Sequence, residues 1–295
     1  MDKSGVVELT LDVYVPPNDV ARFIRRLKGV KPVLGILILI TMITVALTAP
    51  YISSYPPIET NFSLARQAPN AAHWFGTDSL GRDVFSRVVF GSRISLLAGI
   101  IPVSIAGIFG SLFGLLAGYF GGRIEQLIMR LTDVMLAFPS LVLALAIVYT
   151  LGPDFRNALI AIGITMIPEY VRVVRGQTLS LKQFEFIEAT RALGAGHWRI
   201  MWGHIAPNLA APVIVLLTIG SGRAILIEAG LSYLGLGIQP PTPSWGSMIQ
   251  NGYAYLDQAP WMAIFPGLAI VTTVLGINFL GDSLRDIIDP RFRHR

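Results

Sequence analysis

The charged side chains that could carry out chemistry in this chain are few, and three of them interrupt long apolar runs. These are Glu169, Arg223 and Glu228. A charge at the centre of an apolar helix in a membrane costs about 2.5–3.5 kcal/mol on insertion scales, so we expect these side chains to face protein or water rather than lipid. They are candidates for the polar lining of a path through the protein. The alternative is that they hold helices together.

A second candidate is the polar, basic segment at residues 185–208. Glu188, Ala189 and Gly194 have the spacing E-A-x-x-x-x-G, and Pro207 follows Gly194 by thirteen residues. The pattern predicts a helix over 182–193 that glycines end, and a second short helix over 197–204 that stops before Pro207. A helix–glycine–helix unit can enter a groove on another protein. The alternative is a solvated connector.

Motifs for other kinds of chemistry are lacking. The sequence contains no G-x-x-x-x-G-K-[ST] string, so we expect this chain to bind no ATP or other cofactor. The four histidines are scattered rather than spaced as metal ligands, which predicts no metal site. There is no G-x-S-x-G string for a nucleophilic serine and no cysteine for thiol or disulfide chemistry. The sequence therefore favours a protein that is not an enzyme.

The elements that must position these residues are membrane-spanning helices. The chain is 53% hydrophobic and only 14% charged, with a mean hydropathy of +0.61, whereas globular domains are about a quarter charged. About 20 apolar residues cross a bilayer as a helix. Six segments qualify and predict an all-α integral membrane protein: 33–50, 94–120, 134–151, 157–174, 209–231 and 261–280.

The distribution of basic residues predicts the orientation of these spans. Of the 23 Lys and Arg residues, 17 fall on the side that holds both termini and the loop between the fourth and fifth spans. The positive-inside rule makes that side cytoplasmic. It also accounts for the net charge of +5 without a nucleic acid partner. The expected organisation is a cytoplasmic lead (1–32) with an interfacial amphipathic helix at 19–29, the first span (33–50), an external segment (51–93), a core of five spans (94–283) and a cytoplasmic tail (284–295).

Glycines in the second predicted span indicate close helix packing. Gly110, Gly114 and Gly118 recur at steps of four, and Gly107 lies on the adjacent turn. Small residues let helix backbones approach closely in lipid, where apolar burial provides no drive for association. The seam could be internal or could face a partner chain.

Several short segments resemble one family of transport proteins. The 185–208 spacing resembles the EAA loop of permease subunits of ATP-binding-cassette importers. Four further segments resemble the dipeptide/oligopeptide/nickel branch of that family, in the expected order. They are HWFGTD and GRD at 73–83, GYFGG at 118–122, LSYLGLG with PSWG at 231–246, and GD with DPR at 281–291. Together they cover roughly residues 73–292.

The resemblance implies a C-type permease of the cell or inner membrane, which works beside a second, B-type permease. Two ATP-binding subunits would hold ATP and Mg and dock on the EAA loop. An extracytoplasmic substrate-binding protein would deliver the cargo at the external segments. Residues expected to form the coupling loop are Glu188, Ala189, Thr190, Arg191, Ala192, Leu193, Gly194 and Pro207. Thr190 departs from the family pattern, which has a second Ala there.

The function expected from this resemblance is ATP-driven import of di- or oligopeptides. Nickel or another small solute is the alternative within the same branch. An ion-coupled secondary transporter or channel is a separate possibility, which predicts paired intramembrane acids in an internal repeat. Glu169 and Glu228 are too few to argue for proton coupling, and no clear repeat is present. A structural membrane scaffold is the weakest alternative.

Overall fold

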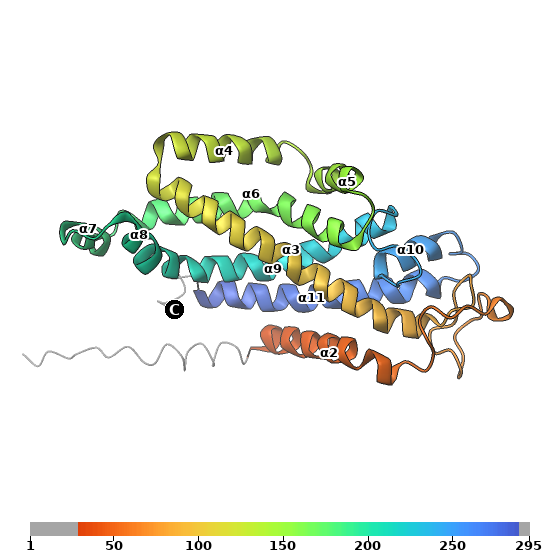
Figure 1. The fold of residues 1–295 in the computed structure, drawn as a ribbon. Helices are drawn as coiled ribbons and strands as arrows, with labels where there is room; N and C mark the ends of the chain where they lie inside the picture. The colour runs from red at the N-terminus through yellow and green to blue at the C-terminus, as the bar shows by residue number, and fades with distance from the viewer. Residues whose placement is uncertain (1–28, 289–295) are drawn as a thin grey trace, which may run out of the picture.

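The long helices run side by side in one bundle (Figure 1). The computed structural model describes residues 29–288. Most of the lead, with the amphipathic helix expected at 19–29, and the last seven residues of the tail lie outside the described part. Five helices are long and apolar enough to cross a membrane: α2 (Val30–Ile52), α3 (Val84–Phe120), α6 (Phe155–Leu181), α9 (Ala206–Tyr233) and α11 (Trp261–Ile288). They confirm five of the six predicted spans.

The remaining predicted span, over 134–151, falls on a pair of helices that could form a sixth span only as a bent pair. α4 (Gly122–Leu136) and α5 (Ser140–Leu151) meet at a bend of 94°. The prediction of one span over 134–151 was therefore wrong at its start, because α4 is amphipathic and carries charges that hid it from a hydropathy count. Pro139 stands at the bend as the N-cap of α5 rather than inside a helix. Its ring favours an extended conformation in the preceding residue and so a helix break there.

The glycines of α3 form an internal seam against α6. A Cβ at Gly110 would lie 2.4 Å from Cβ of Tyr170, and one at Gly114 would lie 2.8 Å from the Val171 carbonyl oxygen. At Gly118 the corresponding distance to Cβ of Thr178 is 2.7 Å. A methyl group fits at none of these positions without a shift. The seam thus explains why α3 and α6 can pack so closely.

One end of the bundle is closed by a cap made of residues 53–83 and the short helix α10 (Trp245–Tyr253). The 3₁₀ turn η1 (Phe62–Leu64) lies in its first part. Indole groups fasten the cap to the spans: Trp245 Nε1 donates to the Val88 carbonyl at 2.9 Å and Trp261 Nε1 donates to the Thr77 carbonyl at 3.0 Å. The cap is therefore a folded part of the bundle.

The opposite end carries two short helices, α7 (Glu185–Ala192) and α8 (His197–Ile200). From α8 the chain continues through a π-helical turn, η2 (Met201–Ile205), into α9. The expectation that the second short helix stops before Pro207 was therefore wrong. Pro207 lies in the first turn of α9, directly after the π-helical turn, and the helix continues past it. The first short helix also begins at Glu185 rather than at 182, since Lys182 caps α6.

Candidate functional site

The turn between α7 and α8 depends on the backbone conformation of Gly194. Its φ is +82°, which L-residues with a side chain rarely adopt. The Gly194 N–H donates to the Arg191 carbonyl at 2.9 Å, and the Ala195 N–H donates to the Thr190 carbonyl at 3.3 Å. This pair of bonds is the Schellman motif that ends helices. The sharp turn expected at Gly194 is present, and it directs the chain from α7 into α8.

Two polar contacts join this turn region to the end of α3. The Tyr119 hydroxyl lies 2.9 Å from His197 Nδ1, at the start of α8. The Lys182 ammonium donates to the carbonyls of Gly118 (3.2 Å) and Tyr119 (2.6 Å), which are among the last in α3. Burial lowers the pKa of Lys182, the charge of Arg191 lowers it further, and Glu125 acts in the opposite direction. Hydrogen bonds therefore join this region, which includes the end of α6, to the end of α3.

α7 is held on the bundle by one apolar side chain and is otherwise open. Ile187 is fully buried, in a cluster with Ile200, Met201 and Ile205. The predicted contact residues lie on the open side or close to it. Glu188, Ala189, Arg191, Ala192, Leu193, Gly194 and Pro207 are exposed, and Thr190 is partly buried with its hydroxyl bonded to the Phe186 carbonyl. Leu193 is 89% exposed.

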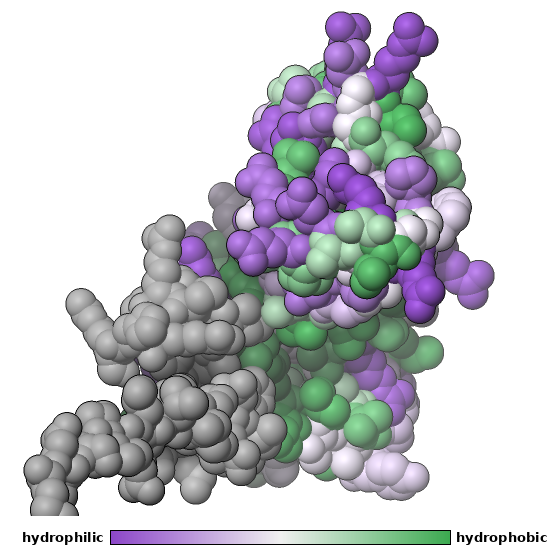
Figure 2. Space-filling view, turned by 90° about the vertical axis from the view of Figure 1, so that its left-hand side faces the viewer, coloured by the Kyte–Doolittle hydropathy of each residue, from purple (hydrophilic) through white to green (hydrophobic). Residues whose placement is uncertain are grey.

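Sequence reasoning missed the aromatic part of this surface. Phe184, Phe186, Trp198 and Trp202 are all between 45% and 65% exposed at this end of the bundle. Figure 2 looks onto this end and shows hydrophobic side chains interspersed with hydrophilic ones. Four aromatic residues in a polar segment were visible in the sequence, but the residues expected to form the coupling loop included no aromatic side chain. Exposed aromatic residues are enriched at protein interfaces.

A second group of residues lies along α6, where three ion pairs join it to its neighbours. Arg175 pairs with Glu125 and Arg172 with Asp133, both on α4. The third pair joins Glu169 of α6 to Arg223 of α9. The structure thus brings together two residues that the sequence singled out separately. Their side chains remain 39% and 51% exposed, on a face that no other described helix covers fully.

Glu228 is separate from this face. Its side chain is fully buried, and its Oε1 accepts a hydrogen bond from Ser232 Oγ at 2.6 Å. Among the described residues, its Oε2 has no hydrogen-bond partner. Arg223 and Glu228 stand five residues apart on α9 and point in different directions, as their spacing predicts. In this conformation Glu228 is a core residue of the bundle rather than part of an open lining.

Comparisons with known proteins agree with this architecture. Residues 110–294 match the model of a family described as binding-protein-dependent transport system inner membrane component. The dipeptide transport system permease protein DppC of Alkalihalophilus pseudofirmus is 46% identical, over 96% of this chain and 93% of its own. The probable D,D-dipeptide permease DdpC of Escherichia coli is 43% identical over 92% and 91% of the two chains. The glutathione permease GsiD of Pectobacterium atrosepticum is 44% identical over 92% and 90%.

A solved structure has the same fold. A chain of the MetNI methionine ABC transporter in an inward-facing conformation superposes with a TM-score of 0.56. The match covers 68% of this chain and 96% of the other at 18% identity, so it bears on the fold alone.

Proposed function

Because the chain belongs to the family of binding-protein-dependent transport system inner membrane components and is a permease subunit of an ATP-binding-cassette importer, we propose that its cargo is a short peptide. The observation that carries this proposal is the set of relatives named for dipeptides and glutathione, which align over at least 90% of both chains. Relatives aligned this fully share the whole bundle and both of its ends.

The proposed docking site for the ATP-binding subunits is the α7–α8 loop. Its exposed apolar side chains, Leu193 and Trp198 among them, support this assignment because exposed apolar patches mark sites of protein interaction. ATP and Mg would be held by those subunits. A movement of the docked loop would reach α3 through Tyr119 and Lys182, and α3 is packed along α6. The bundle would then shift as a unit between inward-open and outward-open states.

The proposed translocation face is the side of α6 that bears the ion pairs. Charged side chains are costly against lipid, so the exposed Glu169–Arg223 pair favours a face that borders water or another protein. A second permease that packs on this side would enclose the path between the two chains. The pair would then lie at the wall of that path. Glu228 would support the wall from inside.

The cap is the proposed receiving surface for the substrate-binding protein. Its charges are largely satisfied internally: Asp78 accepts from Arg82 Nε at 2.6 Å and lies 3.6 Å from Arg87 Nε. A rigid cap suits repeated docking of the substrate-binding protein in one orientation, because little conformational freedom is lost at each docking. Trp74 is 61% exposed on it and is a candidate contact.

The decisive experiment reconstitutes this chain with its partner subunits and binding protein in liposomes. Uptake of a radiolabelled dipeptide is measured with ATP supplied on the side of the ATPases, beside parallel assays with nickel and with a free amino acid. We expect ATP-dependent dipeptide uptake. Uptake of nickel alone would overturn the peptide assignment and leave the importer intact. Dipeptide uptake that requires an ion gradient but no ATP would favour a secondary transporter.

A further inference from the structure

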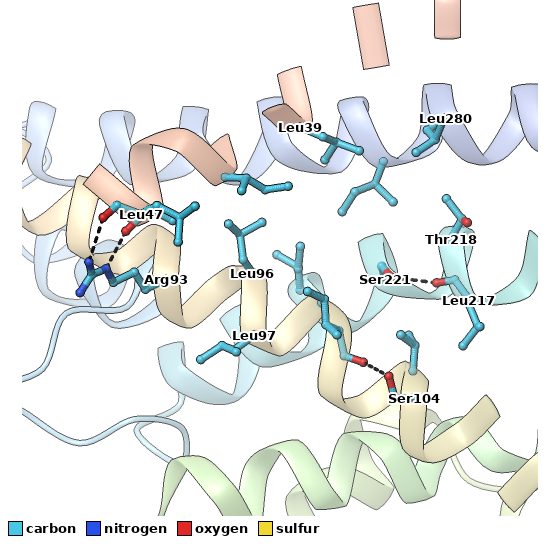
Figure 3. A pocket seen from close by; sticks show the side chains of 17 residues that line it. Leu39, Leu47, Arg93, Leu96, Leu97, Ser104, Leu217, Thr218, Ser221 and Leu280 are labelled. Atoms are coloured by element: carbon cyan, nitrogen blue, oxygen red, sulfur yellow. Dashed lines mark hydrogen bonds between the residues drawn. The ribbon is translucent and has the colours of Figure 1, made fainter. Parts of the chain in front are cut away.

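An apolar groove lies on the side of the bundle away from α4, between α2, α3, α9 and α11 (Figure 3). Its volume is about 730 Å³. Leucine and isoleucine side chains from all four helices line it, including Leu39, Leu96, Leu217 and Leu280. None of the ion pairs of the proposed translocation face touches it. The groove therefore has no part in the transport path described above.

The hydroxyl groups in the lining are already used within their own helices. Ser104 Oγ donates to the Ile100 carbonyl at 2.8 Å, Ser221 Oγ to the Leu217 carbonyl at 2.8 Å and Thr218 Oγ to the Ile214 carbonyl at 2.9 Å. A ligand in the groove finds apolar surface and no free hydrogen-bonding side chain along most of its length. Hydrocarbon is the chemistry that suits such a wall.

One charged residue stands at the cap end of the groove. Arg93 Nε donates to the Ala46 carbonyl at 2.6 Å, and its Nη2 donates to the Leu47 carbonyl at 3.3 Å. Pro50 has no N–H, so the Ala46 carbonyl lacks its usual helical donor and Arg93 supplies one. Among the described residues, Nη1 of Arg93 has no hydrogen-bond partner. A positive charge with unused donors thus closes an otherwise apolar groove.

The length of the groove fits one leaflet of a bilayer. From Arg93 to Ser104 the lining follows α3 for eleven residues, which is about 16 Å at 1.5 Å per residue. Half of a hydrocarbon core is about 15 Å. A chain that begins at the level of Arg93 and follows the groove would end near the middle of the membrane.

We propose that this groove binds one acyl chain of a membrane phospholipid, with the lipid phosphate held by the Arg93 guanidinium. The phosphate complements the charge of Arg93 and accepts from its unused donors. The acyl chain covers side chains that α2 leaves open beside α3. The lipid would fill the space between α2 and the rest of the bundle and hold them together.

The test uses the assembled complex and two lipid probes. After purification through delipidating washes, bound phospholipid is counted by native mass spectrometry. Phosphatidylglycerol and a diacylglycerol with the same chains are then added back while the thermal midpoint is recorded. We expect each copy of this chain to retain about one phospholipid beyond those retained by the other subunits. We also expect phosphatidylglycerol to raise the thermal midpoint more than diacylglycerol does.

Three variants and one control make the assignment specific. Ser104→Phe fills the groove, and Arg93→Gln removes the charge; each should lower the retained phospholipid several-fold and abolish the difference between the two lipids. Arg93→Lys should restore retention in part. Ile108→Phe, on the same helix but outside the groove and 66% exposed, should behave as wild type. Equal retention in Ser104→Phe and Ile108→Phe would overturn the site, and unchanged retention in Arg93→Gln would overturn the role of Arg93.

Discussion

The hydroxyl of Tyr119 lies 2.9 Å from Nδ1 of His197, 78 residues further along the chain. Tyr119 belongs to the last turn of α3, and His197 is the first residue of α8. Their rings meet edge to face, with centroids 5.7 Å apart. This contact links the loop proposed to receive the ATPases with the helix that forms the glycine seam.

Removing that link should weaken coupling while sparing assembly. In Tyr119→Phe the ring packing stays and the hydrogen bond is lost, at a net cost of about 1 kcal/mol. We expect dipeptide uptake per ATP hydrolysed to fall roughly fivefold in proteoliposomes, with unchanged recovery of the ATPase subunits. Tyr51→Phe makes the same chemical change at a residue that is 88% exposed and should have no effect. Full uptake in Tyr119→Phe would show that this hydrogen bond does not transmit the movement of the loop to α3.

The turn after α7 provides a prediction about docking. Gly194→Ala meets no atom within 4 Å of the new Cβ, yet it places a side chain at φ +82° and should cost roughly 1–2 kcal/mol. We expect weaker copurification of the ATPase subunits with a normally inserted permease. Asn tolerates this backbone region, so Gly194→Asn should recover most of the binding.

Gly196→Ala is the matched control for that experiment. Gly196 stands two residues away, is equally open, and has a φ of −70° that any residue adopts. The Gly196→Ala variant should bind the ATPase subunits as the wild type does. If both alanine variants lose binding equally, backbone strain at Gly194 is not the cause.

Most of the fold could be predicted from the sequence because bilayer thickness sets the length of an apolar helix. That argument found α2, α3, α6, α9 and α11. It failed for α4, since Glu125 and Asp133 lower the hydropathy of that helix. Their charges are compensated by Arg175 and Arg172 of α6, a tertiary pairing that no local window contains.

The candidate residues could be named one by one from the sequence, but their arrangement could not. The cost of intramembrane charge identified Glu169, Arg223 and Glu228 individually. Which of them meet depends on the rotation of α6 against α9, so only the structure pairs Glu169 with Arg223 and buries Glu228. Gly194 could be identified from the sequence because a sharp turn needs, at a single residue, a backbone conformation that favours glycine.

The α3–α6 seam should be intolerant of even one methyl group. In Gly114→Ala the Cβ would lie 2.8 Å from the backbone oxygen of Val171, which cannot rotate away. Overpacking of this kind costs typically about 1–3 kcal/mol, so we expect a lower thermal midpoint in detergent. Gly230→Ala in α9 meets only the side chain of Leu141 at 3.5 Å and should be neutral or slightly stabilising. Equal midpoints for the two variants would contradict a tight seam.

The cap should loosen when its central carboxylate is neutralised. Asp78 is buried between Arg82 and Arg87, and it also accepts from the backbone N–H groups of Leu80 and Arg82. Asp78→Asn leaves two buried guanidinium groups without their counter-charge, a change that costs about 3–5 kcal/mol when a buried pair is broken. We expect faster proteolysis within residues 53–83 and lower uptake. Asp257→Asn, an exposed residue near the cap, should leave both unchanged.

The ion pair between α6 and α9 allows the strongest test of the proposed path. Glu169→Gln or Arg223→Gln leaves one charge without its partner on the proposed translocation face, so each should lower dipeptide uptake by an order of magnitude or more. Removing both charges should recover stability without uptake if the pair also contacts the cargo. Exchanging them, as Glu169→Arg with Arg223→Glu, should recover both if the pair only joins the helices.

The readouts in that cycle are uptake and thermal midpoint, measured on the same preparations. Asp133→Asn with Arg172→Gln serves as a control, because this pair also joins α6 to a neighbour and is similarly exposed, at 58% and 53%. A loss confined to the Glu169–Arg223 pair places the path beside α9. Equal losses at the two pairs would instead show that the effect belongs to the whole charged side of α6 and not to the pair beside α9. The doubly neutralised and exchanged pairs therefore distinguish a lining from a joint, which neither single-charge variant reveals alone.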